Sequence, residues 1–230
     1  MMAADLDRVW EGVTARIWAS QPAAVERVAR RLLRSPGLAR ALVTTPSLLG
    51  SWLLASAAVL AVGVLVSREL GTTLVPLLAP ALAGAGIAYS YGPGTDPAYE
   101  LTRSVPVSAR TVLLARALAV FAVNAALGVV ASLAAPAAGG VTVAWLVPMT
   151  AVAALCLAAA TLTGSPAAGA AIGLAGWAIA VLAAQVATGG AERAASVPAL
   201  ILPDLLFAAA CVAVVLHVTR IPGDRVRGGI

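Results

Sequence analysis

The chain has 230 residues, of which 61% are hydrophobic and only 11% are charged, and its formal net charge is +5 at pH 7. A soluble globular domain carries about 25% charged residues, so this composition excludes an ordinary soluble protein and predicts an all-α integral membrane protein. All fifteen basic residues are arginine, and their positions along the chain explain the basic charge without nucleic acid as a partner.

Residues 1–46 form a polar, arginine-rich segment ahead of the first apolar run. Apolar residues recur at helical spacing from Leu6 to Ile17, and Pro22 begins a second stretch in which arginines lie opposite an apolar stripe. Such an amphipathic helix suits the membrane interface, and packing on a cytosolic partner is the alternative. The segment lacks the apolar core of a cleavable signal peptide.

Six stretches approach the roughly 20 apolar residues that a helix needs to cross the hydrocarbon core. They are Ser47–Val66, Thr73–Tyr91, Thr111–Ala134, Val141–Leu162, Pro166–Ala187 and Val197–Thr219. The sequence therefore predicts a segment over 1–46, a six-helix transmembrane domain over 47–219 and a tail over 220–230.

The connections between these spans are mostly short. Ser67–Thr72 is expected to join the first two spans. Thr163–Ser165 is predicted to be a tight turn, in which Ser165 caps the fifth span and Pro166 takes its first helical position. In the sixth span Pro198 and Pro203 are expected to break the helix, so that Val197–Pro203 forms a half-inserted or re-entrant piece on the outer side.

The arginines predict an orientation for these spans. With six spans both termini lie on one side, which then holds thirteen arginines, Arg103, Arg110 and Arg116 among them. The other side holds only Arg68 and Arg193. Cytoplasmic loops are enriched in arginine, so both termini and the 92–110 loop are predicted to be cytoplasmic.

The loop between the second and third spans is the longest polar interruption of the predicted membrane domain. Asp96 can cap a helix that begins at Pro97, and Pro106 disfavours helical geometry at the residue before it. A short helix is therefore predicted over Pro97–Ser104, and Ser108 can cap the next span. A capped, charged helix is more structure than a chain reversal needs, so the loop is interpreted as a docking element; a solvated turn is the alternative.

Small residues in the spans favour close helix packing. Gly169 and Gly173 form a GxxxG pattern in the fifth span, which suits contacts within the chain or between two chains. Cys156 and Cys211 lie inside apolar spans and are interpreted as small packing residues.

Few polar side chains interrupt the spans: Asn124, Gln185, Asp204 and His217. Asp204 and His217 lie near predicted span ends and are interpreted as interfacial, although an ionisable group in a span is a functional candidate by default. Asn124 and Gln185 are candidates for lining a substrate pathway. The spans carry no chain of carboxylates, which argues against proton-coupled transport.

The sequence carries no catalytic signature. The HExxH, GxSxG and Walker A patterns are absent, and a single histidine cannot build a multi-histidine metal site. The chain is therefore expected to be no enzyme and to bind no metal or cofactor itself.

From Asp96 to Arg116 the sequence resembles the permease subunits of type-2 ABC exporters. The matching pattern, DPAxEL…PxSxRxxLLAR, comprises Asp96, Pro97, Ala98, Glu100, Leu101, Pro106, Ser108, Arg110, Leu113, Leu114, Ala115 and Arg116. The wider layout, an amphipathic connecting helix followed by six spans, is also similar.

The resemblance implies that Pro97–Ser104 is a coupling helix, which inserts into a separate ATP-binding subunit. The partner-coupling residues would be Asp96, Pro97, Tyr99, Glu100, Leu101, Arg103 and Arg110, with Thr163–Ser165 as a minor second contact. Two permease chains, identical or different, would work with two ATPase chains in the bacterial cytoplasmic membrane. The partner would bind ATP and Mg²⁺, and the few charges in the spans favour a hydrophobic or amphiphilic substrate.

Two other functions are compatible with the sequence. A membrane anchor or regulator would recruit a cytosolic partner through the arginine-rich N-terminal segment and would not need the capped helix. A haem-exporter membrane subunit would have a similar size and span number, but this chain offers only His217 as a histidine ligand.

Overall fold

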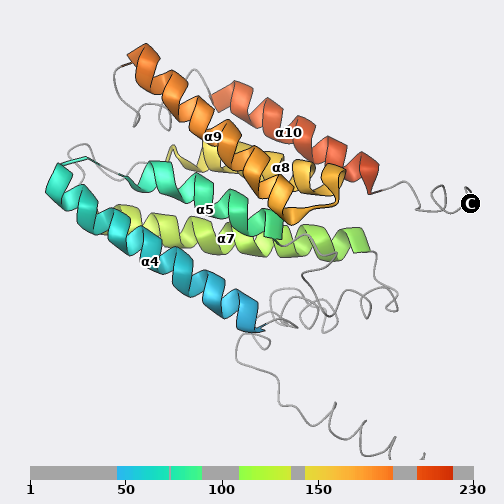
Figure 1. The fold of residues 1–230 in the computed structure, drawn as a ribbon, viewed down its shortest axis with the longest axis horizontal. Coiled ribbons are helices and arrows are strands. Elements are labelled where there is room, and N and C mark those ends of the chain that lie inside the picture. The colour runs from blue at the N-terminus through green and yellow to red at the C-terminus, as the bar shows by residue number, and fades with distance from the viewer. Residues whose placement is uncertain (1–45, 73, 90–108, 136–142, 189–200, 220–230) are drawn as a thin grey trace, which may run out of the picture. The chain divides into compact units, whose positions relative to one another are not determined.

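The computed structural model describes residues 46–72, 74–89, 109–135, 143–188 and 201–219, all within one compact unit, 45–230. This described part contains six α-helices and no strand, so the predicted all-helical class is confirmed. The helices are α4 (Pro46–Leu70), α5 (Val75–Tyr89), α7 (Ala109–Ala134), α8 (Leu146–Thr163), α9 (Pro166–Thr188) and α10 (Ile201–Val218) (Figure 1).

Five of these helices are long and apolar enough to cross a membrane, which supports a multi-pass membrane protein. The exception is α5, which is apolar but has 15 residues. It occupies the middle of the predicted second span, and Pro80 lies inside it.

The helices alternate in direction along the chain. Arg68 in the last turn of α4 donates a hydrogen bond from Nη2 to the carbonyl oxygen of Ala134, at the end of α7 (3.1 Å). At the opposite end of the bundle, Ile87 of α5 belongs to the same apolar cluster as Leu113 of α7 and Leu157 of α8.

This alternation gives the bundle two distinct ends, which we name by residues they contain. The turn end, on the right of Figure 1, holds the α8–α9 turn together with the ends of α5 and α10 and the start of α7. The Arg68 end holds the ends of α4, α7 and α9 and the starts of α5, α8 and α10.

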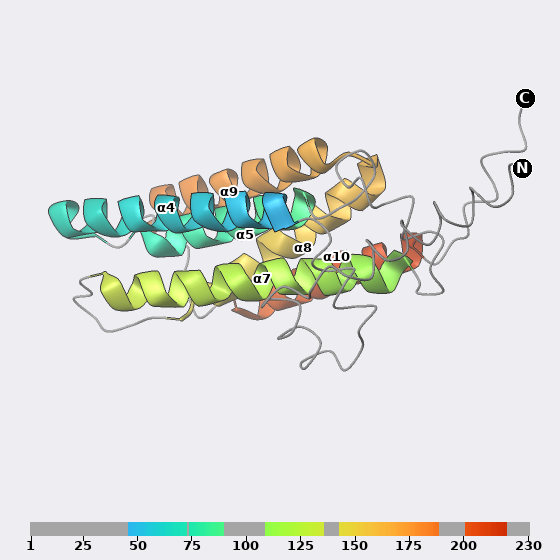
Figure 2. The ribbon, with the colours of Figure 1, turned by 90° about the horizontal axis from the view of Figure 1, so that it is seen from below.

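The central helix is α8. Its span is 67% buried, against 17–28% for the other four long helices. It packs against α5, α9 and α10, and Figure 2 shows it between a layer of α4, α5 and α9 and a layer of α7 and α10. Alanine is its most frequent residue, and such small side chains let neighbouring helices approach from several sides.

Cys156 of α8 lies at the closest of these approaches. A Cβ on Gly84 of α5 would lie 2.8 Å from Cys156 Sγ, and a Cβ on Gly173 of α9 would overlap the same sulfur. A Cβ on Gly169 would lie 2.5 Å from that of Ala160. The GxxxG pattern therefore packs within the chain. The interpretation of the cysteines as packing residues is also confirmed, because both are free and buried.

The prediction that Ser67–Thr72 is a loop was wrong, because α4 continues to Leu70. The helix ends at Gly71, whose φ of 65° is the left-handed conformation that terminates helices. Ser67 Oγ donates to Gly63 O (2.6 Å) and accepts from Leu74 N (2.9 Å), which ties the end of α4 to the start of α5.

The expected helix break at Pro203 was also wrong. Residues Ile201 to Val218 form one helix, and Pro203 lies in its first turn. The first four N–H groups of a helix have no intrahelical acceptor, so a proline there loses no hydrogen bond. The rest of the expected re-entrant piece, 197–200, lies outside the described residues.

The helix in the predicted fourth span begins at Leu146, whereas the span was predicted to begin at Val141. Val143 to Trp145 form a turn, in which Leu146 N donates to Val143 O (3.0 Å). The buried Trp145 ring lies directly over Gly128 of α7, where a Cβ would come within 2.5 Å of the ring. This contact positions the start of α8 against α7.

Candidate functional site

The turn end carries the α8–α9 connection, which was predicted to be a tight turn. Gly164 has a φ of 66° and ends α8, while Thr163 Oγ1 donates to Ala159 O (2.7 Å). Ala168 N donates to Ser165 Oγ (3.3 Å), and Pro166 begins α9, so the predicted cap and proline position are confirmed. Thr163 and Gly164 are exposed.

The longer connection at the same end joins α5 to α7. Its candidate coupling residues Asp96, Pro97, Tyr99, Glu100, Leu101 and Arg103 lie outside the described residues. Arg110 lies in the first turn of α7. α5 therefore ends at Tyr89 and α7 begins at Ala109 at the same end of the bundle where Thr163–Ser165 reverses the chain.

The two candidate pathway residues lie in different surroundings. Asn124 is 2% exposed and donates from Nδ2 to Val120 O (2.9 Å). Gln185 is exposed near the end of α9. Because α7 and α9 do not pack extensively against each other, the structure does not bring these two side chains together.

Buried polar atoms occur on α4 and α7, and two of the residues that carry them, Trp52 and Ser56, were not singled out from the sequence. Trp52 Nε1, Ser56 Oγ and Asn124 Oδ1 are buried and have no hydrogen-bond partner among the described residues. Trp52 lies over Gly86 of α5, where a Cβ would come within 2.7 Å of the indole. Helical spacing alone could show that Trp52 and Ser56 share a face, but not that the face is buried.

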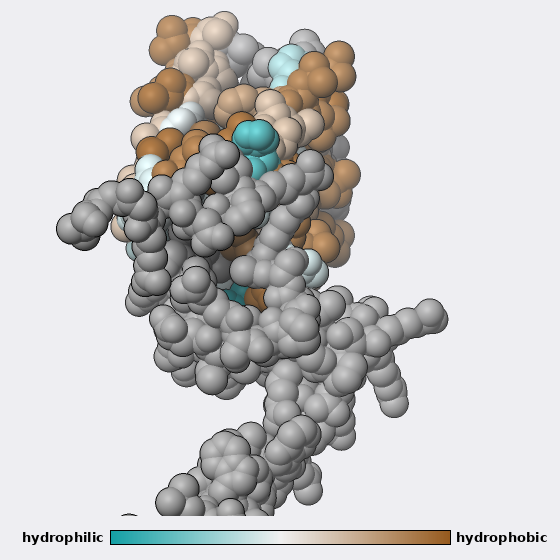
Figure 3. All heavy atoms as spheres, turned by 90° about the vertical axis from the view of Figure 1, so that its right-hand side faces the viewer, coloured by the Kyte–Doolittle hydropathy of each residue, from teal (hydrophilic) through white to brown (hydrophobic). Residues whose placement is uncertain are grey.

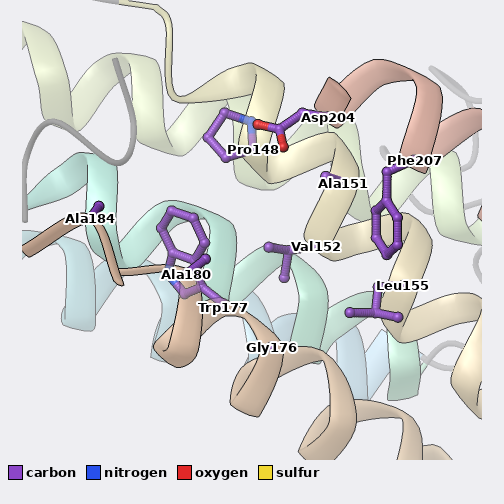
Figure 4. Close-up of a pocket in the computed structure, with 10 residues that line it drawn as sticks. All are labelled: Pro148, Ala151, Val152, Leu155, Gly176, Trp177, Ala180, Ala184, Asp204 and Phe207. Atoms are coloured by element: carbon purple, nitrogen blue, oxygen red, sulfur yellow. The ribbon is translucent and has the colours of Figure 1, made fainter. Parts of the chain in front are cut away.

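A hollow opens between α8, α9 and α10, towards the Arg68 end of the bundle (Figure 4). Its volume is about 260 Å³ and nine of its ten lining residues are apolar, which leaves Asp204 as the only charged one. The larger lining side chains are Val152, Leu155, Trp177 and Phe207. The sequence did not predict this hollow, because three helices contribute residues that no single periodicity connects.

The two ionisable residues of α10 lie at its ends, as predicted. Asp204 is in the first turn and half-buried, whereas His217 is in the last turn and exposed. An acidic residue near a helix N-terminus and a basic one near its C-terminus both interact favourably with the helix dipole. In the part of the chain that the structure describes, no group of three or more His, Cys, Asp or Glu residues could hold a metal ion.

No protein-family model, curated protein or solved structure matches this chain.

Proposed function

We propose that this protein is the membrane-spanning permease subunit of an ABC exporter, which couples to a separate ATP-binding subunit through its 92–110 loop. The observation that carries the proposal is the apolar cluster at the turn end. Ile87, which precedes the α5–α7 connection, and Leu113, which follows it, belong to this cluster with Leu157 of α8.

This cluster gives a partner's movement a mechanical route into the bundle. A subunit that binds the 92–110 loop would push or pull on the end of α5 and the start of α7. Close-packed side chains transmit displacement rather than absorb it. The displacement would reach α8, which packs against α5, α9 and α10 and so connects the end of the bundle to its centre.

In the proposed orientation the turn end is cytoplasmic and the Arg68 end is external. Arg110 and Arg116 then lie at the cytoplasmic start of α7, in agreement with the arginine asymmetry of the whole chain. Both termini would be cytoplasmic, and the six helices would each be one span.

The short α5 is compatible with six spans. Its 15 residues give a helix of about 22 Å, shorter than a hydrocarbon core of about 30 Å. Nine of those residues, including Pro76, Ala83 and Ala88, are buried against other helices. Non-helical backbone at membrane depth is tolerated where protein covers it, so flanking residues can complete the crossing.

The outward faces of the helices suit a lipid or a second permease chain. Leu54, Leu65 and Leu118 are 74%, 60% and 68% exposed. In Figure 3 hydrophobic side chains dominate the visible flanks of the described helices. An apolar surface of this extent needs a membrane or a partner to cover it.

The test is co-purification of the tagged protein from its native cells in mild detergent, with an ATPase assay of the eluate. The proposal predicts a stoichiometric ATP-binding subunit, which is lost when Glu100→Ala and Arg103→Ala are combined. The matched control combines Glu192→Ala with Arg193→Ala, which removes the same two charges from the loop predicted to be external. This control should keep the ATPase.

A chain that purifies without an ATPase, while other transporters from the same cells stay intact, would contradict the permease function and favour a membrane anchor. Equal loss of ATPase from both double variants would contradict the 92–110 loop as the docking element.

A further inference from the structure

The hollow between α8, α9 and α10 combines an apolar interior with one carboxylate. Asp204 and Phe207, one turn apart on α10, both turn from that helix towards α8 (Figure 4). Trp177 of α9 and Val152 of α8 form the wall farther from α10. The cavity thus has aromatic side chains from two helices and a negative charge at its border.

We propose that this hollow binds a small hydrophobic organic cation. Its ammonium group would lie beside Asp204, and its apolar body would lie between the rings of Trp177 and Phe207. The site itself follows from the geometry of the described residues. Only the further statement that such a ligand is transported rests on the proposed function.

Charge decides the class of ligand. Asp204 is half-buried among apolar residues, and no described residue forms an ion pair with it. A carboxylate removed from water is stabilised by a positive partner and repels an anion. The remaining nine lining residues offer no polar side chain apart from the indole N–H, so a sugar or another polar neutral molecule would lose its hydrogen bonds to water.

The aromatic rings strengthen this selection. Trp177 is 8% exposed, and its Nε1 donates to Leu77 O of α5 at 2.9 Å. That hydrogen bond directs the polar edge of the indole away from the ligand site and fixes the ring. A fixed ring costs little entropy when a ligand binds, and indole is the strongest of the aromatic partners for a cation. Phe207 is 47% exposed, so a ligand could cover it.

Volume limits the size of the ligand. A cavity of about 260 Å³ lies just below the range of about 300–1,000 Å³ that is usual for ligand pockets. One aromatic ring or branched alkyl group with one ammonium centre fits this volume, whereas a polycyclic drug would protrude. The ligand is therefore a small amphiphile with a single positive charge.

Asp204 also has the simpler role of an acidic residue in the first turn of a helix. That role does not require a cavity or two aromatic side chains next to the carboxylate. It also predicts no difference in binding between a cation and its neutral isostere. A comparison of the two ligands therefore distinguishes a cation site from a purely helix-stabilising role of Asp204.

The test uses the full-length protein in nanodiscs of zwitterionic lipid, which do not concentrate cations. The probe is radiolabelled benzyltrimethylammonium, whose charge is permanent. We expect saturable binding that excess unlabelled cation displaces and that neopentylbenzene, its neutral isostere, does not.

Two substitutions address the charge and the aromatic wall separately. Asp204→Asn keeps the shape and should weaken binding about tenfold or more. Asp204→Glu keeps the negative charge that attracts the cation and should bind within about threefold of the natural chain. Phe207→Leu should weaken binding about threefold through loss of its ring. Size-exclusion profiles identify any variant that has not folded, and Asp204→Glu keeps the test valid in that case.

Glu69→Gln is the matched control. Glu69 is an exposed carboxylate at the same end of the bundle but not in the hollow. Removal of the Glu69 charge should change the affinity for the cation by less than about twofold, because solvent screens an exposed charge. Equal binding of the natural chain and Asp204→Asn, or displacement by the neutral isostere, would overturn the proposed site.

The outcomes separate this site from the transport function. Cation binding that depends on Asp204, in a protein without an ATPase partner, would support the proposed cation site and contradict the permease function. An ATPase partner without cation binding would support the permease function and contradict the proposed cation site.

Discussion

Arg68 donates a hydrogen bond to the carbonyl oxygen of Ala134, 3.1 Å away, and thereby joins the last turns of α4 and α7. The last carbonyl groups of a helix have no intrahelical donor, and a positive charge is favourable beside them. The contact shows that these two helices run in the same direction, as two spans separated by a third would do.

The first prediction concerns this contact. Arg68→Ala should lower the free energy of unfolding by about 0.5–1 kcal/mol, because the Ala134 carbonyl loses its charged donor. Titration with SDS in mixed micelles measures the change. Glu69→Ala, a neighbouring exposed position, should have no comparable effect, and equal losses would contradict a specific role for Arg68.

The second prediction concerns the space around Cys156. Gly173→Ala would place a methyl group onto Cys156 Sγ and should destabilise the protein by about 1–3 kcal/mol. The same change at Gly176 meets only the flexible end of Leu155, at 3.1 Å, and should be neutral or stabilising through helix propensity.

Cys156→Ala should recover part of that loss. In a double-mutant cycle, Gly173→Ala combined with Cys156→Ala should cost less than the sum of the two single changes. Strictly additive changes in the free energy of unfolding would show that the methyl group added at position 173 does not clash with Cys156 Sγ.

The third prediction compares two buried tryptophans. Trp177→Phe removes the hydrogen bond to Leu77 O as well as ring volume, whereas Trp145 Nε1 has no partner among the described residues. Trp177→Phe should therefore be about 1 kcal/mol more destabilising than Trp145→Phe. Equal costs in the same unfolding titration would mean that the hydrogen bond contributes nothing net.

The sequence predicted most helix positions because the apolar runs are long and the turn residues are distinctive. Ser165 and Pro166 determine the start of α9 by capping chemistry that is local in the chain. The end of α4 was predicted too early because of Arg68 and Glu69, since charged residues in a last helical turn resemble a loop in sequence. A helix break was wrongly predicted at Pro203. Proline is incompatible with a helix interior but compatible with a first turn, and Pro203 lies in the first turn of α10.

The hollow and the buried polar atoms could not be predicted in this way. Trp177 lines the hollow because its N–H bonds to Leu77, which is 100 residues away in the chain. Which face of α8 meets which neighbour depends on the fit of Gly84 and Gly173 around Cys156. These relationships come from tertiary packing among many similar alanine-rich surfaces, and one sequence does not specify which surfaces meet.

The fourth prediction concerns orientation and uses accessible cysteines. In a background with Cys156→Ala and Cys211→Ala, Glu69→Cys and Ser165→Cys place single thiols at the Arg68 end and the turn end. A membrane-impermeant maleimide added to intact spheroplasts should label position 69 and should label position 165 only after lysis. The reverse pattern would contradict the orientation, and labelling of both from outside would contradict a membrane-spanning bundle.

The most direct test of the permease function is photocrosslinking from the predicted coupling helix in native cells. A photoreactive phenylalanine analogue replaces Tyr99, and the same analogue at Val130, a 63% exposed position within the α7 span, is the control. A permease that couples through the 92–110 loop should give an ultraviolet-dependent adduct between position 99 and an ATP-binding subunit, with none from position 130. A fully inserted protein that gives no such adduct from position 99, or the same adduct from both positions, would contradict this function.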